Sequence, residues 1–263
     1  MEKKDGDKMI FDGSGSLFGN AEGMPERTGD IKKVHIKDKL VALGQPLESL
    51  NLGNFDFIGE YTAKKNRSRD SELYRKVGAF FRPNYERGLL IYALIKHFNV
   101  KSYVEIGFGR GYSCFCAAYA FSEIGGGEII TIDPALNREH IQPLANVFPK
   151  EWFQMINFYG SDSDSFFKNE ARDTYDMIYI DGDHRYEFVK RDWENSRNRY
   201  QKVLLFDDYH LPGKTNKDIE VSSLVDSIED DTKELVIMDR RVFVDDRGYS
   251  DDEIDYGQVI LTK

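Results

Sequence analysis

The sequence predicts an α/β fold in which helices cover both faces of a doubly wound, mostly parallel sheet. Three observations predict it. Short apolar runs, typical of strands buried on both faces, alternate with segments that carry apolar residues at helical spacing. A glycine-rich turn separates the first of these strands from the next helix. Aspartates follow several strands at the points where the strands end.

The alternation of helices and strands can be followed element by element. Helical spacing predicts helices at 86–98, 112–124, 138–147, 163–171 and 186–200. Apolar runs predict strands at 102–107, 129–133, 153–160, 175–181 and 202–208. Two further strands, 234–246 and 257–263, are joined by an acidic loop. They predict a C-terminal antiparallel hairpin at the edge of the sheet.

The N-terminal part of the chain lacks this pattern. Residues 1–45 are rich in glycine and charge without apolar periodicity, which favours a mobile arm or an extended lid outside the core. Residues 46–80 mix aromatic and polar side chains, as expected of a cap over a site. A length of 263 residues suits one α/β domain with an added segment. We therefore expect an arm and cap over 1–83 and a single domain over 84–263.

Composition and charge predict a soluble, cytoplasmic protein. Apolar runs such as Leu89–Ile95 are far too short to cross a bilayer, and no apolar stretch follows the charged N-terminus as in a secretory signal. Cys114 and Cys116 have neither disulfide-framework nor zinc-knuckle spacing, which favours reduced core thiols. A net charge of −10 disfavours a nucleic-acid partner. The formation of a homo-oligomer is left open.

The glycine-rich turn lies between the strand 102–107 and the helix 112–124. It contains Glu105, Gly107, Gly109, Gly111, Tyr112 and Ser113. Glycines let a ligand approach the backbone closely, and the amides that begin the helix attract a negative group. The third glycine, however, comes one residue earlier than in dinucleotide-binding turns, and Glu105 would repel a pyrophosphate. An amino group or a sulfonium therefore fits this turn better.

Asp133 ends the strand that follows, about twenty residues after the turn. A carboxylate at this point commonly accepts hydrogen bonds from ribose hydroxyls. The alternative is a chance glycine turn followed by a capping aspartate. The order of strand, turn, helix, strand and acid favours a nucleoside site in a Rossmann-like fold.

Two later strand ends carry dense polar groups. Asp181, Asp183 and His184 follow one strand, whereas Asp207, Asp208 and His210 follow the next. Ligands of open parallel sheets bind beyond the carboxyl ends of the strands, so these groups should share one crevice. Clustered carboxylates repel one another unless a cation neutralises them. A hard divalent ion is therefore predicted, magnesium first and manganese or calcium as alternatives, although helix and turn capping would also explain some of the aspartates.

His184 is the candidate general base because it lies beside the predicted metal site and just before a helix. His210 is the competing candidate. His35, His97 and His140 lie away from strand ends and are assigned no role.

The segments VEIGFGRGYS and TIDP resemble the first two signature motifs of class I S-adenosylmethionine-dependent methyltransferases. The resemblance implies that Glu105 and the glycine turn, through Tyr112 and Ser113, hold the methionine part of the cofactor. Asp133 would bind its ribose, and Asp181 would also face it. Ser161 and Asp162, after the third strand, match the position that usually faces adenine.

The segment IDGDHRYEFVKRDW resembles a narrower branch, which contains metal-dependent macrolide sugar O-methyltransferases and cephalosporin-hydroxylase-like proteins. By this resemblance Asp181, Asp207 and Asp208 match metal ligands and His184 matches the base. The expected reaction is metal-assisted methyl transfer to a hydroxyl of a sugar or another small polyol, with a small-molecule or glycan acceptor. The resemblance covers residues 84–263 and leaves residues 1–83 unmatched.

Three other functions remain open at this stage. A nicotinamide-dependent oxidoreductase shares the sheet and the ribose carboxylate, but it is disfavoured by the glycine spacing and by Glu105. A non-haem metal-dependent hydroxylase would use Asp181, His184 and His210 as ligands. A non-catalytic protein that merely keeps the fold is the third alternative.

Overall fold

The computed structural model describes residues 31–52, 55, 85–145, 148–211, 219–239 and 256–263. Within them a single sheet has eight strands in the order β1-β7-β8-β6-β5-β2-β3-β4. The strands are β1 Lys32–His35, β2 Ser102–Ile106, β3 Glu128–Ile132, β4 Ile156–Tyr159, β5 Tyr175–Ile180, β6 Tyr200–His210, β7 Glu234–Ile237 and β8 Tyr256–Thr262. Only β8 runs antiparallel to its neighbours. The mostly parallel sheet confirms the predicted fold class.

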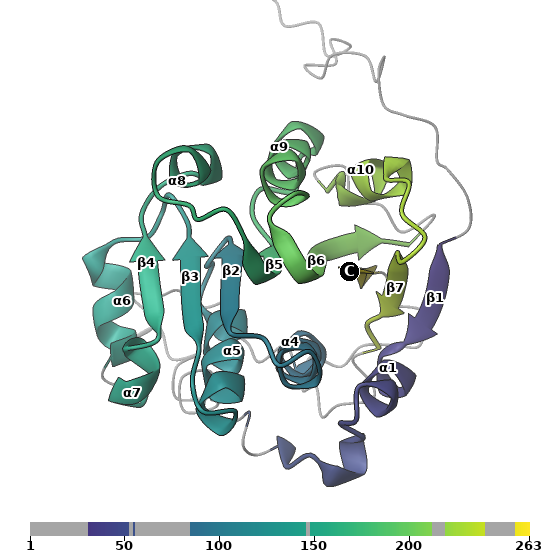
Figure 1. The fold of residues 1–263 in the computed structure, drawn as a ribbon, viewed down its shortest axis with the longest axis horizontal. Helices are drawn as coiled ribbons and strands as arrows, with labels where there is room; N and C mark the ends of the chain where they lie inside the picture. The colour runs from purple at the N-terminus through teal and green to yellow at the C-terminus, as the bar shows by residue number, and fades with distance from the viewer. Residues whose placement is uncertain (1–30, 53–54, 56–84, 146–147, 212–218, 240–255) are drawn as a thin grey trace, which may run out of the picture.

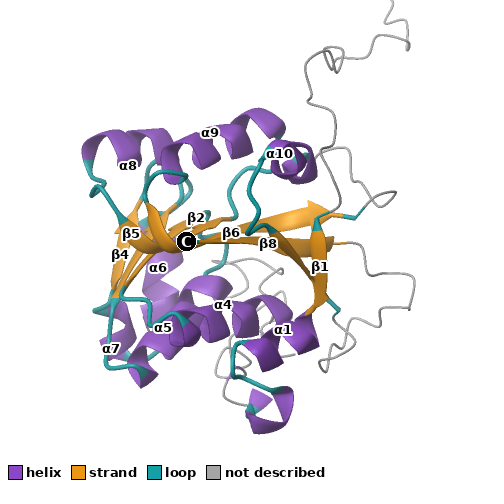
Figure 2. Ribbon diagram, turned by 45° about the vertical axis from the view of Figure 1, so that its right-hand side comes forward, coloured by secondary structure: helices purple, strands orange, loops and turns teal. Residues whose placement is uncertain are grey.

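Helices cover both faces of this sheet (Figures 1 and 2). One layer contains α8 Ser163–Asn169, α9 Tyr186–Ser196 and α10 Val221–Ser227. The other contains α1 Ile36–Ala42, α4 Tyr85–His97, α5 Tyr112–Glu123, α6 Arg138–Ala145 and α7 Lys150–Phe153. A short 3₁₀ helix, Leu47–Ser49, follows α1. No helix in the described ranges is long and apolar enough to cross a membrane.

Alternate residues of the central strands point into two separate cores. Tyr179 of β5 and Leu205 of β6 pack on the side of α4 and α5. Their neighbours Ile180 and Phe206 pack on the side of α8, α9 and α10. Because successive side chains of a strand point to opposite faces, a strand between two helical layers needs apolar residues at every position. This requirement explains the uninterrupted apolar runs in the sequence.

The C-terminal antiparallel pair is confirmed, but its position in the sheet differs from the prediction. Strand β8 lies between β6 and β7, and the strand β1 covers the outer edge of β7. The acidic loop predicted between the two strands falls in 240–255, outside the described residues. The helices α7 and α10 were not predicted.

The interpretation of residues 1–45 as an arm outside the core is wrong for 31–43. Strand β1 pairs in parallel with β7, and Lys32 and Lys39 both form ion pairs with Glu234 of that strand. In α1 the side chains of Ile36 and Leu40 are fully buried. Apolar residues four apart were a usable helical signal, but the charged residues around them obscured it. Residues 1–30 and most of the predicted cap lie outside the described residues.

Candidate functional site

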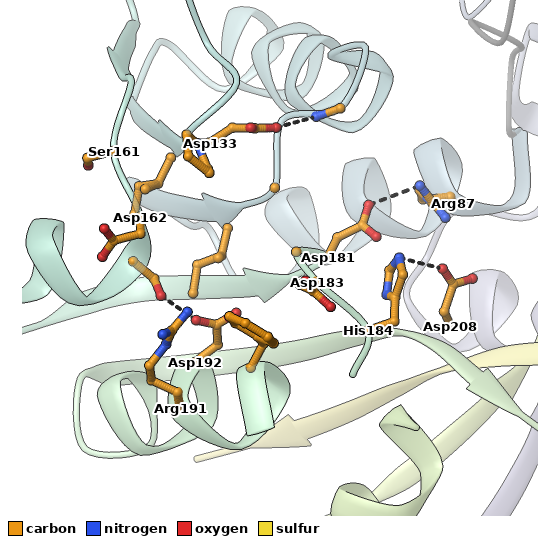
Figure 3. A pocket seen from close by; sticks show the side chains of 18 residues that line it. Arg87, Asp133, Ser161, Asp162, Asp181, Asp183, His184, Arg191, Asp192 and Asp208 are labelled. Atoms are coloured by element: carbon orange, nitrogen blue, oxygen red, sulfur yellow. Dashed lines mark hydrogen bonds and ion pairs between the residues drawn. The ribbon is translucent and has the colours of Figure 1, made fainter. Parts of the chain in front are cut away.

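A cavity of about 570 Å³ opens at the carboxyl ends of the parallel strands. Its walls include Gly107 and Gly109 after β2, Asp133 after β3, and Ser161 and Asp162 after β4. Residues after β5, the bulge in β6 and helix α9 complete it (Figure 3). Its size is within the range of pockets that bind small molecules and cofactors. The predicted crevice therefore exists at the predicted rim of the sheet.

The glycine turn lies at the centre of this rim. The amide of Gly107 donates a hydrogen bond to the carbonyl of Ile132 at 2.8 Å, and its backbone has a φ of +95°. A side chain at this position would overlap the carbonyl oxygen of Asp181. Only glycine combines this left-handed backbone with such close packing. The turn is thereby held between the ends of β3 and β5.

Glu105 lies beneath the turn and does not line the cavity, although the sequence assigned it to the methionine part of the cofactor. Its side chain is fully buried and accepts hydrogen bonds from the hydroxyls of Ser113, Thr131 and Tyr103. Burial raises the pKa of Glu105 to about 8, which leaves the carboxyl group mostly protonated at neutral pH. Glu105 thus joins β2 to β3 and to the first turn of α5.

The other residues at the start of α5 also lie outside the cavity wall. Gly111 is the N-cap of α5, and a side chain there would overlap the ring of Phe108. Tyr112 is buried against Gly88 and Cys116, and the two cysteines are free and buried as predicted. This part of the motif therefore shapes the turn from behind.

Asp133 connects the glycine turn to the end of β3. Its Oδ2 accepts hydrogen bonds from the amides of Phe108 and Gly109 at 3.2 and 3.1 Å, and its Oδ1 accepts one from Ala135 at 2.8 Å. The carboxylate also lines the cavity (Figure 3). It is therefore oriented by the backbone before any ligand binds.

Asp162 lines the cavity beside Ser161, but it also begins a helix. As the N-cap of α8 it accepts hydrogen bonds from the amide of Ser165 at 2.8 Å and from its hydroxyl at 3.1 Å. The hydrogen bond from the Ser165 amide, more than any other contact, holds the pKa of Asp162 below its usual value. Both carboxylate oxygens of Asp162 are thus used within the helix cap.

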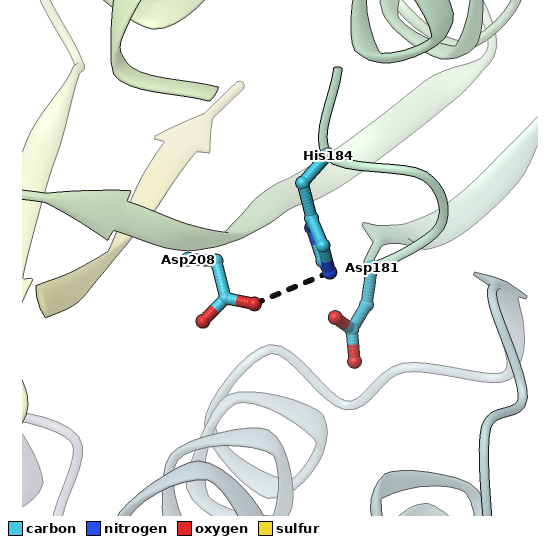
Figure 4. A group of neighbouring side chains, drawn as sticks. All are labelled: Asp181, His184 and Asp208. Atoms are coloured by element: carbon cyan, nitrogen blue, oxygen red, sulfur yellow. Dashed lines mark ion pairs between the residues drawn. The ribbon is translucent and has the colours of Figure 1, made fainter. Parts of the chain in front are cut away.

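Asp181, His184 and Asp208 gather at the other end of the cavity (Figure 4). Each offers one ligand atom, and these three atoms lie within 4.8 Å of one another. The Nε2 of His184 is 3.4 Å from the Oδ2 of Asp208. We call Asp181, His184 and Asp208 the acidic cluster. Two carboxylates and one imidazole at this spacing match the donors of a divalent metal ion.

Consecutive aspartates in β6 have different surroundings because the strand bulges there. The register with β8 shifts between Phe206 and Tyr209, and Asp208 has a φ of +50°. Asp208 lines the cavity, whereas the side chain of Asp207 is fully buried below it. Aspartate tolerates the left-handed backbone better than most residues. The bulge therefore separates two acids that the sequence had placed in one ligand set.

Asp207 is held by Arg87 and Gln258 and is not among the three residues of the acidic cluster. Gln258 of β8 donates to its Oδ1 at 2.9 Å, and the Arg87 guanidinium forms an ion pair with its Oδ2. Burial would raise the pKa of Asp207, but Arg87 and Gln258 outweigh it and keep the pKa below its usual value. Asp207 is therefore a buried anion that is paired with a cation.

Arg87 also reaches the acidic cluster. Its Nη1 lies 3.0 Å from the Oδ2 of Asp181, which in addition accepts a hydrogen bond from the Tyr179 hydroxyl at 3.2 Å. Burial nevertheless raises the pKa of Asp181 well above its usual value, and the nearby charges of Asp207 and Asp208 raise it further. The pKa of Asp208 is raised too, chiefly by burial and then by Asp207. The cluster thus has more negative groups than Arg87 neutralises.

Sequence reasoning missed Arg87 and Gln258. Arg87 comes from the first turn of α4, and Gln258 is a fully buried amide in β8. A polar residue inside an otherwise apolar strand was the only sequence signal for Gln258. His210 is buried outside the cluster, and His35 lies 3.1 Å from Asp239 near β1, far from the cavity lining. The side chain of His140 lies outside the description.

This combination of fold and site defines a class of protein. A parallel sheet with an antiparallel C-terminal strand, a glycine turn after β2, an acid after β3 and polar groups after β4 and β5 is the arrangement of class I S-adenosylmethionine-dependent methyltransferases. The predicted class is confirmed by comparison with known proteins. Residues 104–209 match the family model of a methyltransferase domain. The matched stretch, from β2 to β6, contains the glycine turn, Asp133 and the acidic cluster.

Solved structures support the same fold. An O-methyltransferase from Bacillus cereus in complex with SAH is 16% identical, with a TM-score of 0.54 over 87% of this chain and 97% of that one. The O-methyltransferase TomG from Streptomyces achromogenes, in complex with SAM, is 15% identical, with a TM-score of 0.52 over 81% and 96%. At such low sequence identities these matches indicate a shared fold and nothing more specific. No curated protein sequence matches the chain.

Proposed function

We propose that the protein transfers the methyl group of S-adenosylmethionine to a hydroxyl of a sugar or another small polyol, assisted by a divalent metal ion. The observation that carries this proposal is that one cavity is lined both by the glycine turn with Asp133 and by the acidic cluster. A nucleoside site and a cation site are thereby brought within reach of one another. Methyl transfer needs such closeness because donor and acceptor must be aligned in line.

The cofactor fits the wall formed by β2, β3 and β4. The glycine turn leaves its backbone open to the cavity, and the fixed Asp133 carboxylate suits the ribose hydroxyls. Ser161 and Asp162 line the same wall beyond the ribose. The cofactor supplies the methyl group as an electrophilic sulfonium. Glu105, Gly111, Tyr112 and Ser113 would act on cofactor binding indirectly, by holding the turn in shape.

The divalent ion fits the acidic cluster. Asp181 and Asp208 offer oxygen ligands, and burial together with the neighbouring carboxylates raises the pKa of both. A bound divalent ion lowers the pKa of a hydroxyl that it contacts and so makes the acceptor a better nucleophile. Asp207, the third predicted ligand, would support the site from below through its shared partner Arg87. Magnesium is the first choice, with manganese or calcium as alternatives.

His184 is proposed as the general base. Its Nε2 is oriented by Asp208 and lies close to Asp181, where the acceptor hydroxyl must approach. A neutral imidazole there would take the proton that the hydroxyl loses as the new carbon–oxygen bond forms. The same position would also suit a third metal ligand. Substitution of His184 should leave metal affinity unchanged if it is the base and lower metal affinity if it is a ligand.

The proposed function is tested by thermal unfolding and calorimetry. S-adenosylhomocysteine should raise the melting temperature, because a ligand of the native state stabilises it, and Asp133→Ala should weaken this binding. Manganese should bind to the wild-type protein but not to Asp208→Asn. Asp173→Asn, which removes an exposed carboxylate outside the cavity lining, is the matched control and should keep manganese binding. Preference for NADH over S-adenosylhomocysteine would overturn the proposal.

A turnover assay with polyol acceptors separates the two roles of His184. As a base, His184→Ala should lower turnover by about 10²- to 10⁴-fold while manganese affinity stays the same. Loss of manganese affinity would instead make His184 a ligand. Oxygen-dependent turnover with iron would favour the hydroxylase alternative.

A further inference from the structure

Helix α9 forms part of the cavity wall. Phe188, Arg191 and Asp192 of this helix line it, and no motif assigned any of them a role. Figure 3 shows Arg191 and Asp192 beside Asp162 on one side, and His184 and Asp208 on the other. The cavity therefore has two chemically different ends.

Asp192 is the most buried acid that lines the cavity, with an exposed fraction of 3%. The Ser163 hydroxyl donates a hydrogen bond to its Oδ1. Within the described part of the chain, no group donates a hydrogen bond to its Oδ2. A Cβ atom added to Gly182 would lie 3.3 Å from this oxygen. Because Gly182 also lines the cavity, this oxygen lies at the cavity wall. An acceptor oxygen at the cavity wall that lacks a protein donor can take a hydrogen bond from a ligand N–H group.

Phe188 provides an apolar surface at the same end. The Arg185 guanidinium lies 4.3 Å from the centre of its ring, and the Arg191 guanidinium lies 4.7 Å from it. These cation–π contacts fix the ring, which lines the cavity together with Ile132 and Pro134. A fixed aromatic ring, aliphatic side chains and one buried acceptor suit a flat heterocycle that carries an N–H donor.

The direction of the cofactor follows from its own shape. In S-adenosylmethionine the ribose lies between the reacting sulfonium and the adenine base. The sulfonium must face the acidic cluster, where the acceptor is activated, and Asp133 takes the ribose. The base then extends away from the cluster, toward α9. Adenine is a flat heterocycle whose exocyclic amine is an N–H donor.

We propose that Asp192 recognises the exocyclic amine of adenine and so sets the base specificity of the cofactor site. This inference rests on the proposed function. Asp162 is the less suitable acceptor because its side chain is exposed to solvent, where water competes for it, and it already caps α8 through hydrogen bonds from Ser165. Burial raises the pKa of Asp192 to about 6, so the carboxylate is mostly ionised at pH 7.5 and accepts the amine hydrogen bond.

Calorimetry at pH 7.5 with two ligands tests this assignment. S-inosylhomocysteine differs from S-adenosylhomocysteine in having a carbonyl oxygen in place of the amine, which Asp192 would repel. The wild-type protein should bind S-adenosylhomocysteine at least tenfold more tightly than S-inosylhomocysteine. The inosine ligand would lose the hydrogen bond to the charged Asp192 and leave this acceptor unpaired in the complex. Asp192→Asn should reduce this preference at least tenfold, because its amide can donate to the carbonyl oxygen.

The control is Glu194→Gln, which removes an exposed carboxylate from the same helix and should leave the preference unchanged. If Asp192→Asn does not fold, a purine analogue without the amine tests the wild-type protein, and binding equal to that of S-adenosylhomocysteine overturns the inference. An unchanged preference in Asp192→Asn, or a switch produced by Asp162→Asn instead, also overturns it. If neither nucleoside binds the wild-type protein, the proposed function itself fails.

Discussion

Glu105 and Asp207 are two buried acids on the strands that flank β5, and their charges differ. Both side chains are buried, with exposed fractions of 0% and 1%. Glu105 is surrounded by hydroxyl groups, and burial raises its pKa to about 8. Asp207 meets a guanidinium and an amide, which hold its pKa below the usual value. The partners of a buried acid, and not burial alone, therefore decide whether it is charged.

The difference in charge between Glu105 and Asp207 agrees with where the two acids lie. Glu105 lies behind the glycine turn, where a neutral carboxyl group joins two strands and a helix without adding charge. Asp207 lies under the acidic cluster and shares Arg87 with Asp181. Substitutions of the partners of each acid should therefore have unequal effects on stability.

The largest effect is expected for Arg87→Met. It leaves Asp207 as a buried charge without its cation, which should lower the free energy of unfolding by about 3–5 kcal/mol. Urea unfolding at pH 7 measures this loss. Lys96→Met, which removes a half-buried cation near the other end of the same helix, is the control and should cost about 1 kcal/mol, well below the loss in Arg87→Met. Equal losses in the two variants would contradict the conclusion that Asp207 is a buried charge that depends on Arg87.

Gln258→Leu should have the next largest effect. It removes the donor to Oδ1 of Asp207 but keeps the ion pair with Arg87. Leaving this buried oxygen without a donor should cost about 1–3 kcal/mol of unfolding free energy. The same urea experiment measures this loss. Gln258→Glu, which places a second acid beside Asp207, should lower the unfolding free energy more than Gln258→Leu does. Equal stability of Gln258→Leu and wild type would show that the amide does not contribute to the charge of Asp207.

Ser113→Ala should have a smaller effect, about 1 kcal/mol. Glu105 loses one hydroxyl partner, but it is neutral and keeps contacts with Thr131 and Tyr103. Chemical denaturation of the variant at pH 7 gives the value. A loss as large as that of Arg87→Met would mean that Glu105 is ionised in the folded protein.

Glu105→Gln should change stability least below pH 4.5, where the wild-type carboxyl group is protonated in both the folded and the unfolded state, and its signature is the pH dependence. The pKa of Glu105 is about 8 in the folded protein against an ordinary value of 4.5. Between these values the folded state keeps a proton that the unfolded state releases, so stability should fall as pH rises toward 8. The contribution of Glu105 is fully present below pH 4.5. Unfolding free energies measured from pH 5 to 8 should decline less steeply in Glu105→Gln than in wild type.

The sequence predicted those parts of the site that depend on the direction of the strands. Because parallel strands end at the same rim, Asp133 and Asp181 were expected in one crevice, and both line the cavity. The separate surroundings of Asp207 and Asp208 were not predictable, because they depend on a local register shift in β6. Arg87 was not predictable either, since its partner Asp181 is 94 positions away along the chain. Contacts of this kind are set by the packing of α4 against the sheet.

The contact between Gly107 and the backbone of Asp181 has a consequence for acceptor choice. The amide of Asp181 also donates to the carbonyl of Ile106 at 2.8 Å, so the two strand ends behave as a single rigid piece. Under the proposed function, the spacing between methyl donor and activated hydroxyl would then be a property of the main chain, shared by every acceptor that enters. Evolution of a new acceptor preference would have to act on segments away from this rim, while the reaction geometry is inherited unchanged.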